Sequence, residues 1–327
     1  SRIMIKETAP SNIALIKYMG KEANNIPSNP SLSYSLPHLL TTVEISKTDA
    51  SEDQWAALES EYAIELSEKG KARYLKFFKK LKDHFGLSSN YLIQSANNFP
   101  SDAGLASSAS SFAALTKATY SLAKSELDTE AFQALGFTGE FITDREKLSA
   151  LSRTGSGSSC RSLFDTWSEW QTDFAVEESF SYSKLLHLAI IAEEDKKEVS
   201  SSDAHIKVKS SLLMEGRTAR ANKRLADLKN ALNEKSWEAA FEICWAEFWD
   251  MHALFETSEP SFGYMTADSL MVLNECRSYW KANQDGPLVT MDAGPNVHLL
   301  FREDQKSCYE DFIKIFENKF KIWGSES

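Results

Sequence analysis

The sequence predicts an α+β fold in two domains. A chain of 327 residues is long enough for one large or two mid-sized domains, and its 42% hydrophobic and 25% charged residues are typical of a packed globular protein. Expected strands and helices do not alternate with the regular rhythm that a doubly wound parallel sheet requires. We place the boundary after residue 185, giving an N-terminal domain of residues 1–185 and a C-terminal domain of residues 186–327.

The spacing of apolar residues indicates where the elements lie. Helices are expected over the amphipathic or alanine-rich segments 71–85, 112–123, 143–152, 216–234, 237–254 and 266–283. Strands are expected over segments 91–95, 184–193, 287–291 and 297–301, and one more is expected to end before Lys17. Asn, Ser, Pro and Gly predict loops over segments 24–35, 97–111 and 153–162.

Composition excludes several classes of function. A net charge of −11 disfavours binding to nucleic acid or anionic lipid. The longest apolar run falls well short of the ~18 residues of a membrane span, and residues 1–6 lack a secretory signal. Four widely spaced cysteines favour a reducing cytoplasm, and the six histidines show no metal-ligand spacing. We expect a cytoplasmic protein without a dedicated metal site. Because the protein is acidic, any site for an anion must bring together lysine and arginine side chains and helix N-termini.

The segment 100–109, PSDAGLASSA, carries the strongest local signal. It follows an expected strand and opens an expected helix, so small residues and a helix N-terminus coincide there. Such a start suits phosphate because backbone N–H groups and the helix dipole face the ligand. A serine-rich helix cap has the same appearance. The chain has no G-x-x-x-x-G-K-[ST] motif, which excludes the usual P-loop.

Three further segments contain residues with chemical potential. Segment 153–162, RTGSGSSCRS, includes Arg161, whose planar guanidinium can bind a carboxylate with two hydrogen bonds; a flexible surface loop is the alternative. Lys17 lies at a strand end and either pairs with an anion or reaches solvent. Asp292 precedes Gly-Pro and is either a turn former or a general base. Cys160 has no activating histidine in its neighbourhood, so we expect a packed thiol.

Together these segments resemble the GHMP kinase superfamily and, within it, the diphosphomevalonate decarboxylase family. Segment 100–109 fits the superfamily pattern P-x-x-x-G-L-[AG]-S-S-[AS]. Segments 9–21 (APSNIALIKYMGK), 155–162 (GSGSSCRS) and 292–296 (DAGPN) resemble decarboxylase signatures in the same order, and 25–29 and 196–201 match more loosely. The resemblance implies a two-domain GHMP kinase fold, with a ribosomal protein S5 domain 2-like N-terminal domain carrying the phosphate-binding loop and a ferredoxin-like α/β sandwich carrying Asp292.

The resemblance also implies a reaction and its residues. ATP would phosphorylate the 3-hydroxyl of (R)-5-diphosphomevalonate, and loss of phosphate and CO2 would give isopentenyl diphosphate and ADP. Asp292 would face the hydroxyl, Arg161 would hold the carboxylate, and Lys17 would neutralise charge. Substrate-binding residues would be Asn12, Tyr18, Lys21, Arg73, Ser156 and Ser158. Residues around ATP would be Asn98, Gly104, Ser107, Ser108 and Ser201. Mg²⁺ would bridge the phosphates, and the protein would be a homodimer.

Four positions depart from the family pattern. Met19 replaces a usual Trp, Asp102 adds a negative charge beside the phosphate loop, Asp165 stands in a usual Gly-Gly pair, and Ser202 lies where a basic residue sometimes occurs. These changes leave two alternatives open. One is a sister 3-kinase or decarboxylase acting on mevalonate, 5-phosphomevalonate or a bisphosphomevalonate, and the other is a non-catalytic binding homologue. A serine hydrolase is disfavoured because no G-x-S-x-G motif occurs.

Overall fold

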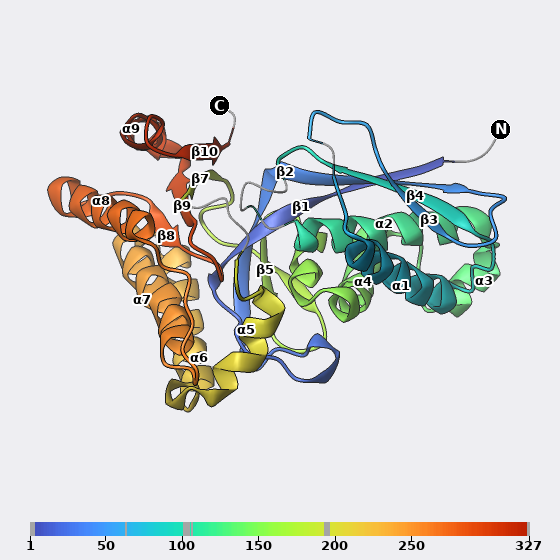
Figure 1. Cartoon of the computed structure of the whole chain (residues 1–327), viewed down its shortest axis with the longest axis horizontal. Helices are drawn as coiled ribbons and strands as arrows, with labels where there is room; N and C mark the ends of the chain where they lie inside the picture. The colour runs from blue at the N-terminus through green and yellow to red at the C-terminus, as the bar shows by residue number, and fades with distance from the viewer. Residues whose placement is uncertain (1–3, 63, 101–104, 106, 193–196, 326–327) are drawn as a thin grey trace.

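The expected α+β architecture is confirmed by two separate sheets with their own helices (Figure 1). The computed structural model describes residues 4–62, 64–100, 105, 107–192 and 197–325. Every strand of the first sheet lies before residue 179, and every strand of the second lies after residue 184. None of the helices within these described ranges is long and apolar enough to cross a bilayer.

The first sheet has the order β3–β4–β2–β5–β6, with β1 paired to β2. Its strands are β1 (Met4–Ile16), β2 (Ser31–Lys47), β3 (Gln54–Ala57), β4 (Tyr91–Asn97), β5 (Trp167–Trp170) and β6 (Ala175–Glu178). Helices cover one of its faces (Figure 1). They are α1 (Glu68–Phe85), α2 (Ser108–Glu126), α3 (Thr129–Ala134) and α4 (Phe141–Gly155).

The second sheet has the order β10–β7–β9–β8 and is antiparallel throughout. Its strands are β7 (Leu185–Ile191), β8 (Leu288–Thr290), β9 (Val297–Arg302) and β10 (Lys321–Gly324). The helices of this half are α5 (Ser201–Lys207), α6 (Arg217–Asn233), α7 (Trp237–Glu256), α8 (Ala267–Asn283) and α9 (Lys306–Phe316). A shared apolar cluster joins the two sheets, since it contains Leu32 and Tyr34 from β2 together with Leu188 and Leu300.

Local sequence explains where the helices begin and end. The Ser67 side chain accepts a hydrogen bond from the Gly70 N–H at the start of α1, which is the usual role of an N-cap serine. The same helix ends at Gly86, whose φ of 72° is readily adopted only without a side chain. Thr266 and Ser269 cap α8 reciprocally. These signals place the helix ends close to where the apolar spacing predicts them.

All three predicted loops are partly wrong. In segment 97–111, Asn97 ends β4 and residues 108–111 begin α2. Residues 31–35 belong to β2, and residues 157–162 form most of a buried 3₁₀ helix, η2 (Gly157–Leu163). Both segments are rich in serine, which is typical of loops when the side chain meets water. Here the hydroxyls find buried partners, because Ser31 accepts from Arg161 and Ser35 donates to the Phe164 carbonyl. A serine-rich segment can therefore be either an exposed loop or a buried element, depending on partners that lie far away in the sequence.

Candidate active site

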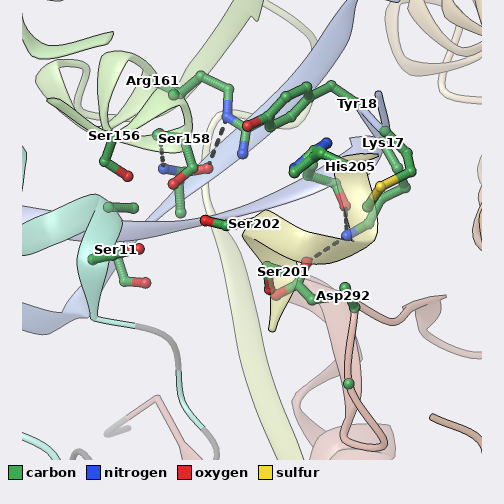
Figure 2. A pocket seen from close by; sticks show the side chains of 18 of the residues that line it. Ser11, Lys17, Tyr18, Ser156, Ser158, Arg161, Ser201, Ser202, His205 and Asp292 are labelled. Atoms are coloured by element: carbon green, nitrogen blue, oxygen red, sulfur yellow. Dashed lines mark hydrogen bonds and ion pairs between the residues drawn. The ribbon is translucent and has the colours of Figure 1, made fainter. Parts of the chain in front are cut away.

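A cavity of about 730 Å³ opens between the two halves of the chain. It is lined from β1, β2, α1, α2, η2, α5, α7 and the β8–β9 loop, so segments nearly 300 residues apart meet in it (Figure 2). Five of the described lining side chains are cationic: Lys17, Lys21, Arg73, Arg161 and Lys197. Asp292 is the single acidic side chain among the described lining residues. An acidic chain has thus concentrated positive charge around one carboxylate.

Lys17 and Asp292 form the central ion pair of this cavity. The Lys17 Nζ lies 2.6 Å from Asp292 Oδ1 and 2.9 Å from the Ala14 carbonyl oxygen. Lys17 is 3% exposed, whereas Asp292 is 46% exposed toward the cavity. Burial opposes ionisation of Asp292, but the charge of Lys17 outweighs it, with help from His298 and Arg161, and lowers the pKa of Asp292 to about 2. Asp292 is therefore an ionised carboxylate at neutral pH, open to a ligand.

The backbone of Lys17 is fixed by a second, fully buried ion pair. Glu247 of α7 accepts a hydrogen bond from the Lys17 N–H at 2.9 Å, and Arg217 of α6 donates to the Lys17 carbonyl at 2.7 Å. Arg217 also binds Glu247 at 2.7 and 2.9 Å, and both side chains are 0% exposed. Sequence reasoning missed this pair. Its signal was the occurrence of Glu247 and Asp250 within the mostly apolar segment 243–255 of α7, because a buried charge requires a partner.

Arg161 on η2 faces the same cavity; its charge affects the pKa of Lys17 and of Asp292, and its guanidinium also lies 5.8 Å from the centre of the Tyr18 ring. Its Nε donates to Asn12 Oδ1 at 3.1 Å and its Nη1 donates to Ser31 Oγ at 2.8 Å. Asn12 is oriented in turn by donating to the Ser158 carbonyl and to Ser162 Oγ. No ion pair to Arg161 occurs within the described residues, and burial lowers its pKa. The guanidinium is thus buried and rigidly held without a protein carboxylate of its own. We call Lys17, Arg161 and Asp292 the Asp292 end.

The other end of the cavity, the Lys21 end, contains Tyr18, Lys21, Arg73, Ser156, Ser158 and His205. Burial and the charge of Arg73 lower the pKa of Lys21. Arg73 donates to the Gly155 carbonyl at 3.2 Å and lies 4.8 Å from the centre of the Phe112 ring. No carboxylate pairs with either cation in the described part of the chain. Two neighbouring cations without a counter-ion form a site for an anion.

His205 belongs to the Lys21 end, although the sequence gave no reason to select it. Its ring stacks on Tyr18 with centroids 4.4 Å apart, and its Nδ1 accepts from the Gly20 N–H at 2.9 Å. Burial, with Lys21 and Arg161 nearby, lowers its pKa to about 3. His205 is therefore neutral at neutral pH, and because Nδ1 accepts a hydrogen bond, its proton lies on Nε2. Figure 2 shows the His205 ring beside Tyr18.

Only some of the residues expected around ATP line the cavity. Ser108 and Ser201 line the cavity. Ser107 precedes α2 as its N-cap, but its side chain makes no capping bond, so the helix start keeps its donors. Asn98 is exposed, accepts from the Leu40 N–H at 2.9 Å, and does not line the cavity described here. Gly104 lies outside the described residues.

Lys197 adds a cation that the sequence identified only within a loose segment match. Its Nζ donates to the Ala293 carbonyl at 2.7 Å and to Ser201 Oγ at 3.2 Å. Burial lowers its pKa, and the charge of Asp292 partly opposes that shift. It thus links Ser201 to the loop that carries Asp292.

The four departures from the family pattern fall in different places. Met19 is 2% exposed and forms an apolar wall of the cavity, and Ser202 also lines it. Asp165 is exposed on the surface, and Asp102 lies outside the described residues. Cys160 is buried, and burial raises the pKa of its thiol to about 12, as expected for a packed residue.

The fold and cavity define a small-molecule enzyme of the GHMP kinase type: two α+β halves with a cation-rich cleft between them. Residues 9–181 match the diphosphomevalonate decarboxylase-like N-terminal domain, and residues 187–325 match the mevalonate 5-diphosphate decarboxylase C-terminal domain. The chain belongs to the diphosphomevalonate decarboxylase family.

Individual relatives agree with this assignment. Diphosphomevalonate decarboxylase of Gibberella zeae is 31% identical, over 90% of this chain and 80% of the relative. The crystal structure of a mevalonate diphosphate decarboxylase from Legionella pneumophila is 40% identical, with a TM-score of 0.88, covering 98% of this chain and all of that chain. The structure of MDDEF in complex with MVAPP, AMPPCP and magnesium is 27% identical, with a TM-score of 0.81, covering both chains fully.

Proposed function

We propose that this chain catalyses the ATP-dependent decarboxylation of (R)-5-diphosphomevalonate to isopentenyl diphosphate, ADP, phosphate and CO2. One observation carries the proposal: five cations and one ionised carboxylate line a single cavity. That substrate carries a diphosphate at one end and a carboxylate beside a tertiary hydroxyl at the other. The two kinds of anion match the Lys21 end and the Asp292 end.

We assign the first chemical step to Asp292 and Lys17. The 3-hydroxyl is a poor leaving group until it is phosphorylated, so its oxygen must attack the γ-phosphorus of ATP. Asp292 orients that hydroxyl and accepts its proton, for which an ionised, cavity-facing carboxylate is suited. Lys17 offsets the negative charge on Asp292 and on the transferring phosphoryl group.

Arg161 acts on the substrate carboxylate in the second step. Its buried guanidinium, fixed by Asn12 and Ser31, would pair with the carboxylate until the C–C bond breaks. The bonding electrons then form the alkene while the C3–O bond breaks and releases phosphate. The proton stored on Asp292 can return to the departing phosphate, which leaves no net proton to dispose of.

ATP and Mg²⁺ fit the remaining side of the cavity. The start of α2, where the Ser107 side chain makes no capping bond within the described residues, offers N–H donors for phosphate, and Ser108, Ser201 and Lys197 line the cavity. We assign Ser107 and Gly104 to the same phosphate-binding segment, and Asn98 to its border. Mg²⁺ would neutralise the phosphate oxygens, held mainly through the nucleotide. The relative bound to AMPPCP and magnesium supports this pair of ligands.

We further propose a domain boundary after residue 185, a cytoplasmic location and a homodimeric state. The boundary is supported by β7 starting the second sheet at Leu185. The location is supported by four free thiols, three of them buried. Cell fractionation and light scattering of the purified protein test the last two.

A substrate panel tests the function against its nearest rival, a 3-kinase or decarboxylase acting on mevalonate, 5-phosphomevalonate or a bisphosphomevalonate. Each compound is incubated with Mg-ATP while ADP and CO2 are followed together. We expect equal amounts of ADP and CO2 with 5-diphosphomevalonate, and little turnover with mevalonate. ADP without CO2 would establish a kinase instead, and no stimulated ATP turnover with any compound would establish a binding homologue.

A further inference from the structure

Three histidines form a hydrogen-bonded chain that leads to Asp292. His298 Nε2 lies 3.9 Å from Asp292 Oδ2, the oxygen that Lys17 does not bind. His298 Nδ1 lies 2.9 Å from His187 Nε2, and His187 Nδ1 lies 3.0 Å from His38 Nε2. Each histidine thus uses one ring nitrogen toward Asp292 and the other away from it.

The chain crosses from one sheet to the other. His187 lies on β7 and His298 on β9, where the register pairs His298 with Ala189, two residues from His187 on the same face. Their rings stack at 5.2 Å. His38 reaches them from β2 of the first sheet. His187 is 0% exposed and His298 is 6% exposed, so solvent does not compete for their ring nitrogens.

Charge selects one direction for the protons in this chain. The ionised Asp292 favours an N–H on the facing His298 Nε2. His298 Nδ1 must then accept from His187 Nε2–H, and His187 Nδ1 must accept from His38 Nε2–H. The chain ends at His38 Nδ1, which is buried and has no hydrogen-bond partner among the described residues. The opposite direction would leave an unpaired, buried N–H there, which is the rarer defect in proteins.

We propose that His38 and His187 fix the Nε2–H tautomer of His298, and that His298 is thereby a positioning residue for Asp292. The inference rests on the proposed function of Asp292. At 3.9 Å from Oδ2 the Nε2–H is beyond hydrogen-bonding distance, so it acts on the carboxylate through its dipole, from the oxygen that Lys17 does not bind. Since the histidines are neutral, they add a dipole without another positive charge in a cavity already rich in cations.

Other charged groups also face Asp292 and must be considered in any pH profile. They are Lys17 beyond β1, Arg161 on η2, Lys197 before α5, and His252 on α7, whose Nε2 lies 3.0 Å from the Asp292 carbonyl oxygen. None of these groups contacts the His187–His38 part of the chain in the described structure. Substitution of His187 therefore changes His298 while leaving the direct neighbours of Asp292 in place.

The first test is made on the ligand-free wild type and is independent of activity. Nitrogen-15 NMR of the histidine rings at neutral pH should show His298 as the neutral Nε2–H tautomer. In His38→Ala, which removes a donor at the partly exposed end of the chain, His298 should become a mixture of tautomers. A protonated or Nδ1–H His298 in the wild type would overturn the proposal.

The second test compares two substitutions of His187. Glutamine can still donate to His298 and accept from His38, so His187→Gln should retain most of kcat. His187→Leu cannot donate, so kcat should fall roughly 3- to 10-fold with the KM for ATP unchanged. In the leucine variant the acidic limb of the kcat profile should also move to higher pH, because Asp292 loses an oriented N–H. His84→Gln, on the distant helix α1, is the control, and thermal unfolding of each variant reports folding.

The outcomes separate the proposals. An equal loss of kcat in His187→Gln and His187→Leu would show that the three histidines contribute packing alone. A leucine variant with unchanged kcat and pH profile would show the same. If His187→Leu does not fold, His38→Ala gives the same comparison. If the wild type releases no CO2 from 5-diphosphomevalonate, the proposed function fails, while the tautomer of His298 is still decided by NMR.

Discussion

The two ends of the cavity hold their cations in different ways. At the Asp292 end, the buried Lys17 is paired with a protein carboxylate at 2.6 Å. At the Lys21 end, burial lowers the pKa of both Lys21 and Arg73, and the charge of Arg73 lowers the pKa of Lys21 further, with no carboxylate beside them in the described residues. The first arrangement is complete without a ligand and holds chemical groups in place. The second is relieved only when an anion binds, so it suits recognition.

Substitution of Asp292 should have the largest effect on activity and tests the chemical role of the Asp292 end. Asp292→Asn removes the proton acceptor and leaves Lys17 buried with an amide. We expect kcat for CO2 release to fall roughly 10²- to 10⁴-fold, with a smaller change in substrate KM. Coupled measurement of ADP and CO2 tests this, and the exposed Asp165→Asn is the matched control. An active Asp292→Asn would remove Asp292 from the chemistry.

The support of Lys17 should matter for folding. Glu247→Gln removes the buried carboxylate that binds Arg217 with two hydrogen bonds and leaves it only Asp250, whose Oδ2 lies 3.4 Å away. We expect the free energy of unfolding to fall by about 3–5 kcal/mol, measured by urea denaturation. The exposed pair of Lys223 and Asp227 supplies the control, because Lys223→Gln should change stability by less than about 0.5 kcal/mol. Similar losses in both variants would contradict a special role for the buried pair.

Arg161→Lys tests how the Asp292 end binds a carboxylate. Lysine keeps the charge but cannot donate two parallel hydrogen bonds or reproduce those to Asn12 and Ser31. We expect the rate of decarboxylation to fall roughly 10- to 100-fold, which corresponds to a loss of about 1.5–3 kcal/mol of transition-state stabilisation. The affinity for ATP should be nearly unchanged. Isothermal calorimetry with nucleotide and a CO2 assay measure the two effects separately. Parallel loss of both would make Arg161 a structural residue.

Lys21→Gln should affect binding more than chemistry. Removing one of the two facing cations should raise the KM for 5-diphosphomevalonate about tenfold, equivalent to about 1.4 kcal/mol, with less change in kcat. Any residual turnover of mevalonate, which lacks the phosphates, should not respond. If kcat falls and KM does not, the Lys21 end participates in chemistry and the distinction between the two ends disappears.

Stability should decrease as the pH falls below about 6.5. His205 at the Lys21 end and His252 beside the Asp292 carbonyl are buried, and burial lowers their pKa values to about 3 and about 4. Between these values and about 6.5 the unfolded chain binds protons that the folded chain does not, so each histidine costs up to about 1.4 kcal/mol per pH unit. Urea midpoints at about pH 7.5 and about pH 5 measure the change, and His205→Asn should flatten it.

Much of the fold could be predicted from local pattern. The amphipathic spacing of α1 and α7, the glycine after α1 and the apolar strands around Asp292 are each encoded by neighbouring residues. β2 was not predicted, because its serines resemble a loop until Arg161 and the Phe164 carbonyl supply partners from 130 and 129 residues away. Of the expected site residues that the structure describes, the catalytic and substrate-binding ones line the cavity, as do Ser108 and Ser201, whereas Asn98 and Ser107 do not.

By itself, the sequence determined the residue types of the chemistry: one aspartate, a lysine at a strand end, an arginine beside glycines and a serine-rich helix start. Only the tertiary structure decided which residues lie next to them. It pairs Lys17 with Asp292 across 275 residues, fixes Lys17 through Glu247 and Arg217, and aligns three histidines from two sheets. The physical reason is that a pattern records each residue's own preference, whereas the energy of a buried charge depends on partners that only folding brings near.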